Sequence, residues 1–489
     1  VNVQTATTDN LSFQVGSAIS LTANQEDFGS GMGNKSGETF ARATLTANNS
    51  TNNATRNYYV YLDITSNDFE YTTVDEQAEL LLKVTDPTGS EETTLGNLER
   101  KTSGGETGFD ITESTGLITI ADNYEITSTG TVTQDWNIEV IFANLNSDQN
   151  ANTGKSFSAS LIIWEDKIPT TVADVCPDGG NLASCIAKLN TEAGDGIAGI
   201  YYHDDDLANG AQDNSYRYSG ANPNNYVCFD SDEGSCPADN LYRIIGVFNS
   251  QVKLIKADYT TSTALGTDGD YSTSTYTASS YPNYSGSLTT INRYYWNNNT
   301  EINTWSESEL NTVNLNTNYL NSLGSEWSDL IAETIWQVGG GTYDNLEYSN
   351  AQTAYNYEIG ANSANTTYSA KIGLMYVSDY YYGASPTYWS YPGYTTSSHP
   401  NTDGNYGADY DYRAAINDNW MYMRIPEWTI SHNSDYSYRA FYVSSIGIVD
   451  GNGGVLSNVP AVRPSFYLES IVEIFGGDGT QENPFRIVV

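Results

Sequence analysis

The sequence predicts a mainly β protein of two domains. These are a β-sandwich of jelly-roll or immunoglobulin-like type over residues 1–168 and an α+β domain over residues 169–489. Short apolar runs recur between clusters of Gly, Asn, Asp and Ser, a pattern typical of strands joined by polar turns. Helical periodicity is confined to a few stretches after residue 168. The 39 Tyr and 9 Trp supply core volume in a chain that is only 38% hydrophobic.

The first domain carries the most regular strand pattern. Residues 1–9 alternate, with Val1, Val3 and Thr5 on one face, and therefore predict a strand. This strand is either an edge strand of its own sandwich or an assembly strand donated to a neighbouring subunit. Further strands are predicted at Tyr58–Ile64, Glu79–Val84, Gly116–Ile120, Asn137–Phe142 and Ser156–Ile163.

The second domain mixes helical and strand patterns after a polar linker at Glu165–Val175. A helix is predicted at Asn181–Leu189, and the Ser-x-x-Glu pattern at Ser306–Glu309 predicts the start of another. The stretch Thr260–Thr289 is expected to be a long surface loop. A further helix is predicted at Glu326–Trp336, burying Trp327, Leu330, Ile331 and Ile335.

Strands joined by turns are expected to complete this domain. The stretch Leu241–Ile255 has strand character, and the polar run Asp450–Asn458 is expected to turn the chain. By analogy alone, the arrangement is compatible with a C-type-lectin-like core. The predicted C-terminal strands lie at Phe441–Ile448, Phe466–Leu468 and Phe485–Val489.

Three C-terminal motifs carry a resemblance to a known family. They are EWTIS at Glu427–Ser431, VRPSFYL at Val462–Leu468 and GGDGTxxNPF at Gly476–Phe485. Together they resemble the signature of a bacterial domain of unknown function on secreted and pilin-like surface proteins of Gram-positive lineages. Similar residues occur at Asn225–Val227, Leu241–Phe248, Val252–Ile255, Trp336 and Met375–Tyr380.

This resemblance covers roughly residues 175–489. It implies an extracellular, cell-surface protein. The first domain resembles, in architecture only, the sandwiches of fibre and surface proteins.

The charge balance excludes some partners. With 60 acidic and 20 basic residues, the formal net charge is −40, which disfavours nucleic acid. No run of 18 apolar residues exists, so no membrane span is expected. The chain starts with Val1 rather than Met, which predicts a processed, secreted protein.

The four cysteines form two close pairs in sequence, Cys176/Cys185 and Cys228/Cys236. Neither pair has CxxC spacing or a histidine at ligand distance, which argues against zinc. Local disulfides in an oxidising compartment are the favoured interpretation, with cross-pairing left open.

No catalytic residue is predicted. His203, His399 and His432 lie in polar surroundings without a nucleophile motif, and no phosphate-binding glycine loop or HExxH motif occurs. The sequence therefore predicts a protein that is not an enzyme.

Two loop regions are candidates for binding. Oxygen ligands at Asp403, Asn405, Asp409 and Asp411 could hold Ca²⁺, although solvated turns use the same residues. Rings crowd together at Tyr381, Tyr388, Trp389 and Tyr394 beside amide side chains. They predict either carbohydrate or protein recognition, or packing of an irregular core.

Two functions follow from these features. The first is a structural subunit of an extracellular filament or surface assembly, a homopolymer built head to tail by donating the N-terminal strand, with a surface or adhesive second domain. The alternative is a monomeric carbohydrate-binding surface adhesin. An enzyme with an unrecognised site ranks third.

Overall fold

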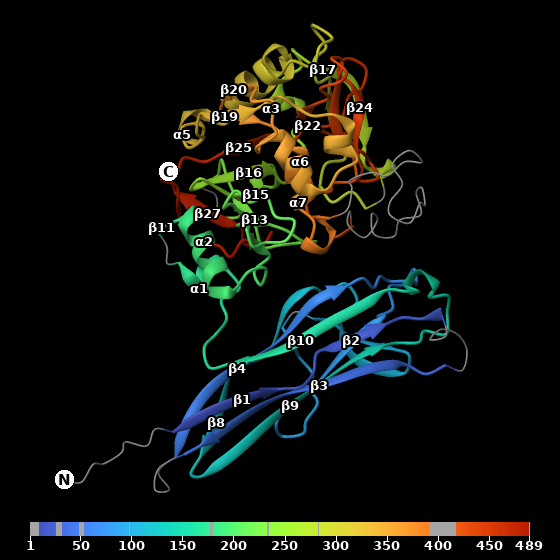
Figure 1. The fold of residues 1–489 in the computed structure, drawn as a ribbon, viewed down its shortest axis with the longest axis vertical. Helices are drawn as coiled ribbons and strands as arrows, with labels where there is room; N and C mark the ends of the chain where they lie inside the picture. Colours follow the sequence, from blue (N-terminus) through green and yellow to red (C-terminus); the bar gives the residue numbers. More distant parts are fainter. Residues whose placement is uncertain are drawn as a thin grey trace, which may run out of the picture. The chain divides into compact units, whose positions relative to one another are not determined.

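The computed structural model describes residues 9–25, 32–47, 53–96, 98–176, 179–231, 234–281, 283–390 and 417–488. The protein is mainly β, with 38% of residues in strands and 17% in helices, which confirms the predicted fold class. Its chain forms two compact units, Val1–Ile168 and Pro169–Val489 (Figure 1). Each unit is described by itself.

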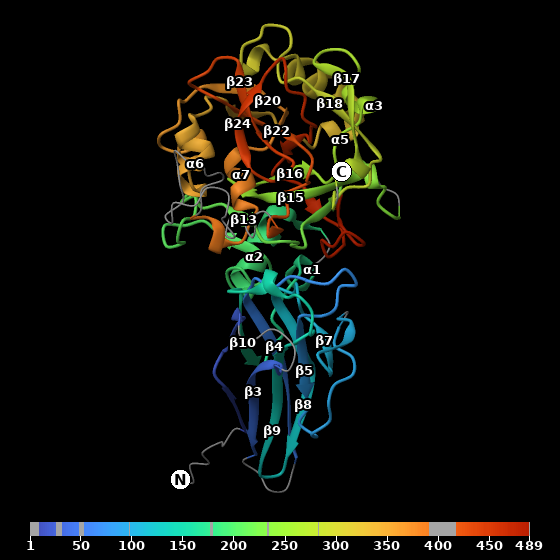
Figure 2. The same cartoon turned by 90° about the vertical axis from the view of Figure 1, so that its right-hand side faces the viewer.

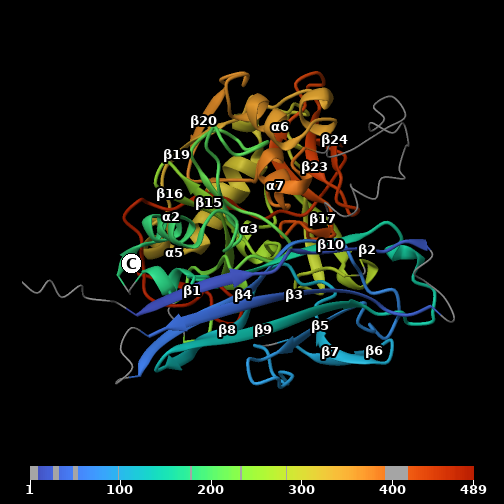
Figure 3. The same ribbon diagram turned by 60° about the horizontal axis from the view of Figure 1, so that its bottom comes forward.

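The first unit is a sandwich of two antiparallel sheets. Their strand orders are β1-β3-β9-β5-β7-β6 and β2-β10-β4-β8, and the long strands β3, β4, β8 and β9 run along the sandwich (Figures 2 and 3). Each strand predicted between residues 58 and 163 lies within one of them, except that Glu79 of the predicted strand Glu79–Val84 precedes β5. The bounds are β1 Asn10–Val15, β2 Ile19–Thr22, β3 Lys35–Thr46, β4 Ala54–Asn67, β5 Leu80–Thr85, β6 Arg100–Ser103, β7 Glu106–Asp110, β8 Gly116–Ser128, β9 Thr131–Phe142 and β10 Ser156–Trp164.

Side chains from both sheets form one core in this unit. Along β10 every second residue from Phe157 to Ile163 is buried, and β9 does the same from Trp136 to Phe142. This period of two places one face of each strand toward the opposite sheet.

The edges of the two sheets differ in length. In the six-stranded sheet the outer strands are β1 and β6, and in the four-stranded sheet they are β2 and β8. Strand β8, with 13 residues, is much the longest of these, and within the described residues it pairs only with β4. An unpaired strand edge can accept an additional strand.

The second unit is built on a ten-stranded sheet in the order β11-β26-β27-β14-β15-β16-β25-β21, with β13 also paired to β15 and β12 to β13. Its described strands are β11 Gly180–Asn181, β12 Ile200–Tyr202, β13 Tyr216–Tyr218, β14 Tyr226–Cys228, β15 Leu241–Phe248, β16 Gln251–Lys256, β17 Tyr271–Thr277, β18 Thr290–Tyr294, β19 Thr334–Gln337, β20 Thr367–Ala370, β21 Ile372–Gly373, β22 Glu427–His432, β23 Arg439–Val443, β24 Val449–Gly454, β25 Ser465–Tyr467, β26 Glu473–Ile474 and β27 Phe485–Val488.

Short helices surround this sheet. Two of them, α6 and α7, lie side by side (orange in Figure 1). The α-helices are α1 Val172–Val175, α2 Leu182–Ala193, α3 Ser262–Leu265, α4 Leu320–Ser322, α5 Gly324–Ser328, α6 Ala351–Glu358 and α7 Val377–Tyr382, and the chain is π-helical at Leu310–Tyr319 and Tyr343–Glu347.

The central sheet joins segments that are distant in the sequence. Strand β27 near the C-terminus pairs in parallel with β14, with Phe485 opposite Val227. Strand β25, from the VRPSFYL motif, pairs with β16. Segments of two C-terminal motifs, VRPSFYL and GGDGTxxNPF, therefore lie in one sheet, whereas EWTIS forms β22 of a separate three-stranded sheet in the order β22-β23-β24.

The predicted helix at Glu326–Trp336 is wrong in its second half. Helix α5 ends at Ser328, and Thr334–Gln337 forms strand β19, paired with β20. Trp336 is buried while its neighbour Ile335 is 70% exposed, which is the alternation of a strand. Trp327 and Ile331 are buried as expected.

Three further local predictions are corrected by tertiary contacts. Thr260–Thr289 is not a loop throughout, because β17 pairs with β18. The predicted turn at Asp450–Asn458 begins as strand β24, in which Gly453 packs so tightly against Trp428 that a Cβ atom would lie 2.6 Å from its ring. The helix after Ser306 starts at Leu310, whose amide donates to Asp270.

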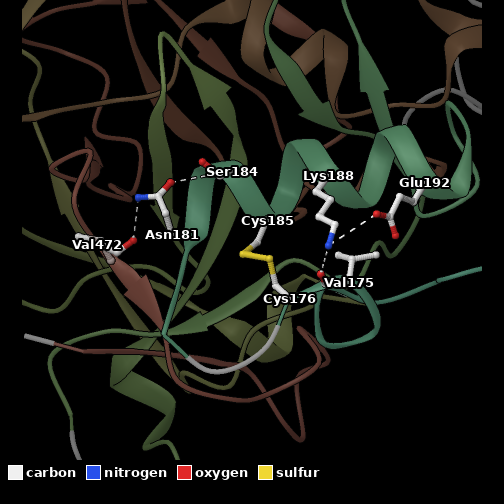
Figure 4. Close-up of a disulfide and its surroundings, with 8 residues drawn as sticks. All are labelled: Val175, Cys176, Asn181, Ser184, Cys185, Lys188, Glu192 and Val472. Carbon is white, nitrogen blue, oxygen red and sulfur yellow. Dashed lines mark hydrogen bonds and ion pairs between the residues drawn. A yellow bond between two sulfur atoms is a disulfide. The ribbon is translucent and has the colours of Figure 1, made fainter.

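Two local disulfides, Cys176–Cys185 and Cys228–Cys236, are present in the second unit, as the sequence predicts. The first joins α2 to the segment after α1 (Figure 4). Beside it, the Lys188 ammonium donates to the carbonyl oxygen of Val175 at 2.6 Å. Helix α2 is thus held to α1 by both a covalent bond and a hydrogen bond.

Candidate functional site

A pocket of about 240 Å³ lies in the second unit. Residues from β13, β15, β19, α6, α7 and β25 line it, so it is assembled from parts of the chain between residues 213 and 467. Its floor is charged, and aromatic rings form much of its wall. The polar groups that decide its chemistry are Asp213, Ser215, Arg217, Gln337 and Asp379.

Arg217 is the central cation of the pocket. It lies on β13 and is 1% exposed. Its Nη2 donates to Asp213 Oδ2 at 2.7 Å, and its Nε donates to Ser215 Oγ at 2.9 Å. The guanidinium carbon lies 4.6 Å from the ring centroid of Phe248 and 4.9 Å from that of Tyr382. These contacts fix the guanidinium plane.

A second buried ion pair lies beside it. Lys253 on β16 is completely buried, and its Nζ is 2.5 Å from Asp379 Oδ2 on α7. The ammonium is also within 6 Å of four aromatic rings, of which Tyr376 is the nearest at 4.5 Å. A cation in such an aromatic cage is stabilised by the ring quadrupoles.

The carboxylate of Glu358, at the end of α6, fixes the start of α7. Its two oxygens accept the backbone N–H groups of Val377 at 2.9 Å and Ser378 at 2.8 Å. Asp379 Oδ2 accepts the Tyr376 N–H at 2.9 Å. Carboxylates at a helix N-terminus bind amides that the helix itself leaves unpaired, so Asp379 is held in a defined position.

Burial and ion pairing shift the pKa values of the charged residues of the site in opposite directions. Burial alone lowers the pKa of Arg217, but Asp213 and Asp379 outweigh burial and raise it. Burial also lowers the pKa of Lys253, and here the attraction of Asp379 only partly opposes it. The pKa of Asp213 is lowered because Arg217 outweighs the burial that would raise it.

Three buried polar atoms around the pocket have no hydrogen-bond partner within the described residues. They are Arg217 Nη1, Asp379 Oδ1 and Gln337 Oε1. The first two form an ion pair at 3.6 Å, too long for a hydrogen bond. Buried polar groups are rarely left unsatisfied, since each costs about 1–3 kcal/mol. These three atoms are therefore exceptions to that rule within the described residues.

The aromatic residues predicted to bind a ligand are mostly not at the surface. Tyr381 and Trp389 are buried. The Tyr381 hydroxyl donates to Leu346 O, and the Trp389 indole N–H donates to Ala384 O. Tyr388 is half-buried, and Tyr394 lies outside the described residues. The first two rings pack the core, which was the alternative interpretation.

The other predicted sites fall outside the described residues. This applies to Val1, Val3 and Thr5 of the assembly strand. It also applies to the candidate Ca²⁺ ligands Asp403, Asn405, Asp409 and Asp411. In the described part of the chain, no group of three or more His, Cys, Asp or Glu side chains is placed to hold a metal ion.

His203 has a structural role. Its Nδ1 accepts the Ala211 N–H at 3.0 Å, and its ring packs against Tyr382 and Trp389. Burial lowers the pKa of His203 well below its ordinary value.

Polar residues of the C-terminal motifs also have structural roles. Glu427 of EWTIS and Arg463 of VRPSFYL form a buried ion pair, with Oε1 2.7 Å from Nε. In GGDGT, Asp478 Oδ1 accepts the backbone N–H of Thr480 at 3.0 Å. These contacts hold the strands and turns around the central sheet.

The pocket residues were not predicted as a site. Lys253 interrupts the apolar run Val252–Ile255, and a charge in a buried strand is a signal that it has a partner. That partner is Asp379, which lies 126 residues further along the chain. Only the fold brings the two residues together.

The chain matches no family model, no curated protein and no solved structure. Fold and site therefore define only a broad class: a mainly β protein of two units with a charged, aromatic-walled pocket. Among the described residues, no helix is both long and apolar enough to span a membrane.

Proposed function

We propose that this protein is an extracellular surface protein that binds a small polar ligand in the pocket beside Arg217 and Asp379. The observation that carries this proposal is a pocket whose lining combines four aromatic rings with the polar residues Asp213, Ser215, Arg217, Gln337 and Asp379. Small-molecule sites typically combine aromatic walls with a few convergent polar groups. An extracellular location is supported by the two disulfides, which are typical of oxidising compartments.

The ion pairing of the charged groups fits a binding site better than a catalytic one. Arg217, Lys253, Asp213 and Asp379 are paired with one another. Each would therefore give up an ionic partner to act as an acid, base or nucleophile. A rigid, paired network instead presents fixed donors and acceptors.

A ligand screen tests this proposal. Ligand-observed NMR would be run on the full chain with neutral sugars, sugar acids, amino acids and small carboxylates, each at ~10 mM because weak binding is the expectation. Gln337→Leu replaces one polar side chain of the pocket lining without touching an ion pair. Gln352→Leu is the matched control, since Gln352 donates to Gly210 O and does not line the pocket.

We expect at least one solute class to bind the wild type and Gln352→Leu, and to bind Gln337→Leu more weakly. Absence of binding by every class would refute the proposal. Equal binding by all three proteins would place the site elsewhere.

A second candidate function is a filament or surface-assembly subunit that polymerises by donating the strand at residues 1–9. One observation favours it: the outer edge of β8, 13 residues long, has no strand partner within the described residues. Pairing with a strand from a neighbouring subunit would satisfy the backbone groups of that edge.

Deletion of residues 1–9 tests this second function. Donation predicts that wild-type protein forms polymers in negative-stain electron microscopy, whereas the deleted protein is a folded monomer. Pairing within the same sandwich predicts lower thermal stability of the first unit instead. Polymers that persist after the deletion would exclude strand donation.

A further inference from the structure

Lys253 and Asp379 form a contact that differs from the other lysine–carboxylate pairs of the described residues. Both side chains are buried, with exposed fractions of 0% and 1%, and Nζ lies 2.5 Å from Oδ2. In the other pairs within these residues the lysine side chain is between 18% and 51% exposed. Water can hydrate those ammonium groups, whereas Lys253 is cut off from water, which disfavours its charged form.

The surroundings of Lys253 do not satisfy an ammonium group. An ammonium has three N–H donors, and Asp379 is the hydrogen-bond acceptor that Nζ contacts among the described residues. The ring centroids of Tyr376, Trp336 and Tyr467 lie 4.5–5.3 Å from Nζ, and ring faces attract a cation less strongly than an oxygen acceptor does. Burial lowers the pKa of Lys253. The site therefore favours the neutral amine, which is the nucleophilic form of lysine.

The charged network around these two residues holds more carboxylates than cations. Its cations are Arg217 and Lys253, and its carboxylates are Asp213, Asp379 and Glu358. Glu358 and Asp379 both accept backbone N–H groups at the start of α7. Desolvation of buried ions is often not repaid by their attraction. A reaction that removes one cation and one carboxylate together lowers this cost and leaves the net charge unchanged.

We propose that Lys253 and Asp379 react to form an amide bond, a covalent crosslink between β16 and α7. The two groups are in contact in the folded chain, so the reaction is unimolecular and needs no encounter in solution. Neither residue gives up an ionic partner, because the two partners react with each other. The crosslink goes beyond the proposed ligand-binding function and does not depend on it.

The reaction is a condensation that releases one water molecule. A proton first passes from Nζ to Oδ2 across their contact, which turns the ion pair into an amine and a carboxylic acid. The amine lone pair then attacks Cγ, and Oδ1 carries the negative charge of the tetrahedral intermediate. A proton passes from the nitrogen to the Oδ2 hydroxyl, the Cγ–Oδ2 bond breaks, and Oδ2 leaves as water. No oxidant, reductant or further co-reactant is consumed.

Neighbouring groups suit this reaction. Arg217 Nη1 lies 3.6 Å from Asp379 Oδ1 and has no hydrogen-bond partner within the described part of the chain. A guanidinium beside the oxygen that becomes negative stabilises the intermediate. The Tyr376 N–H donates to Asp379 Oδ2 at 2.9 Å and fixes the orientation of the carboxyl group. Asp379 also belongs to the lining of the pocket of about 240 Å³, which can receive the released water.

Mass spectrometry of the denatured full chain tests the crosslink. After reduction and alkylation of the 4 cysteines, we expect the wild type to be lighter than its sequence mass by one water molecule. Proteolysis and tandem mass spectrometry should then find the peptide with Lys253 joined to the peptide with Asp379. These two measurements on the wild type decide the proposal without requiring any variant to fold.

Variants assign the crosslink to these residues. Lys253→Arg keeps a positive charge, but a guanidinium stays protonated and is not a nucleophile, so this variant should have its full sequence mass, as should Asp379→Ala. Lys101→Arg is the matched control. Lys101 Nζ lies 2.8 Å from Asp110 Oδ2, but its side chain is 25% exposed, and this variant should still lack one water.

Migration in a denaturing gel gives an independent readout. The crosslink joins residues that are 126 positions apart and therefore keeps the denatured chain more compact. Under reducing conditions the wild type and Lys101→Arg should migrate faster than Lys253→Arg. A wild-type chain of full sequence mass would overturn the proposal, as would a water loss mapped to another residue or one that persists in Lys253→Arg. The ligand screen is unaffected by any of these results, so the two proposals fail separately.

Discussion

The buried pair Glu427–Arg463 gives the sharpest prediction for stability. Glu427 is 2% exposed and Arg463 is 1% exposed, and the Arg463 Nη2 also donates to Met421 O at 2.8 Å. Burial lowers the pKa of Arg463, but Glu427 outweighs burial and raises it. In Glu427→Gln the guanidinium stays charged and buried without a counter-ion, which is expected to cost about 3–5 kcal/mol.

The measurement is urea unfolding of the full chain with the disulfides intact. Tryptophan fluorescence reports mainly on the second unit, which holds Trp296, Trp305, Trp327, Trp336, Trp389, Trp420 and Trp428 of the 9 tryptophans. An unchanged slope of free energy against denaturant would show that the denatured state is unaffected.

Two further variants serve as controls. Glu192→Gln breaks the exposed pair with Lys188, 3.6 Å apart, and should cost less than about 1 kcal/mol. The double variant Glu427→Gln/Arg463→Met removes both charges and should be more stable than Glu427→Gln alone. The reasoning is refuted if Glu427→Gln costs less than about 1 kcal/mol, or if the double variant is no more stable than Glu427→Gln alone.

Three other outcomes are expected. Burial raises the pKa of Glu347 to about 7, above its ordinary value. The folded state therefore holds a proton that the unfolded chain releases, so the stabilisation is complete below about pH 4.5 and is lost as pH rises through 7. This dependence of the free energy of unfolding on pH amounts to roughly 3 kcal/mol. Glu347→Gln should remove it, and unfolding measured at a series of pH values from 4 to 8 checks this. The Cys228→Ala/Cys236→Ala variant should lose roughly 2–3 kcal/mol in the loop-entropy model, and peptide mapping without reduction should find no cross-pairing in the wild type. A Cβ atom at Gly246 would lie 2.3 Å from Tyr216 O, so Gly246→Ala should separate β13 from β15. It should cost about 1–3 kcal/mol and weaken ligand binding through displacement of Arg217, and unchanged binding would contradict the placement of Arg217 at the site.

Much of the strand pattern is local in origin. Alternation of apolar and polar residues in Ser156–Trp164 predicts both the strand and its buried face, because a strand repeats every two residues. The disulfides follow from the short separation of their cysteines. The helix at α2 follows from the spacing of Leu182, Ile186 and Leu189, all buried.

Other features depend on contacts that local sequence does not encode. Trp336 and Ile335 are compatible with a helix or a strand until β20 pairs with β19. The polar run Asp450–Asn458 predicts a turn, and only pairing with β23 and packing against Phe441 and Trp428 make its first half part of strand β24. Tyr381 and Trp389 have the composition of a recognition surface, yet their neighbours bury them.

The sequence by itself determined the mainly β class, five strands of the first unit (β4, β5, β8, β9 and β10) and the two cysteine pairs, because each depends on residues close together in the chain. Only the tertiary structure decided the pocket. Arg217, Lys253, Gln337 and Asp379 come from four separate elements, and only Lys253 stands out in its own segment. Their ion pairs arise from long-range packing, which places buried groups together without regard to their separation in sequence.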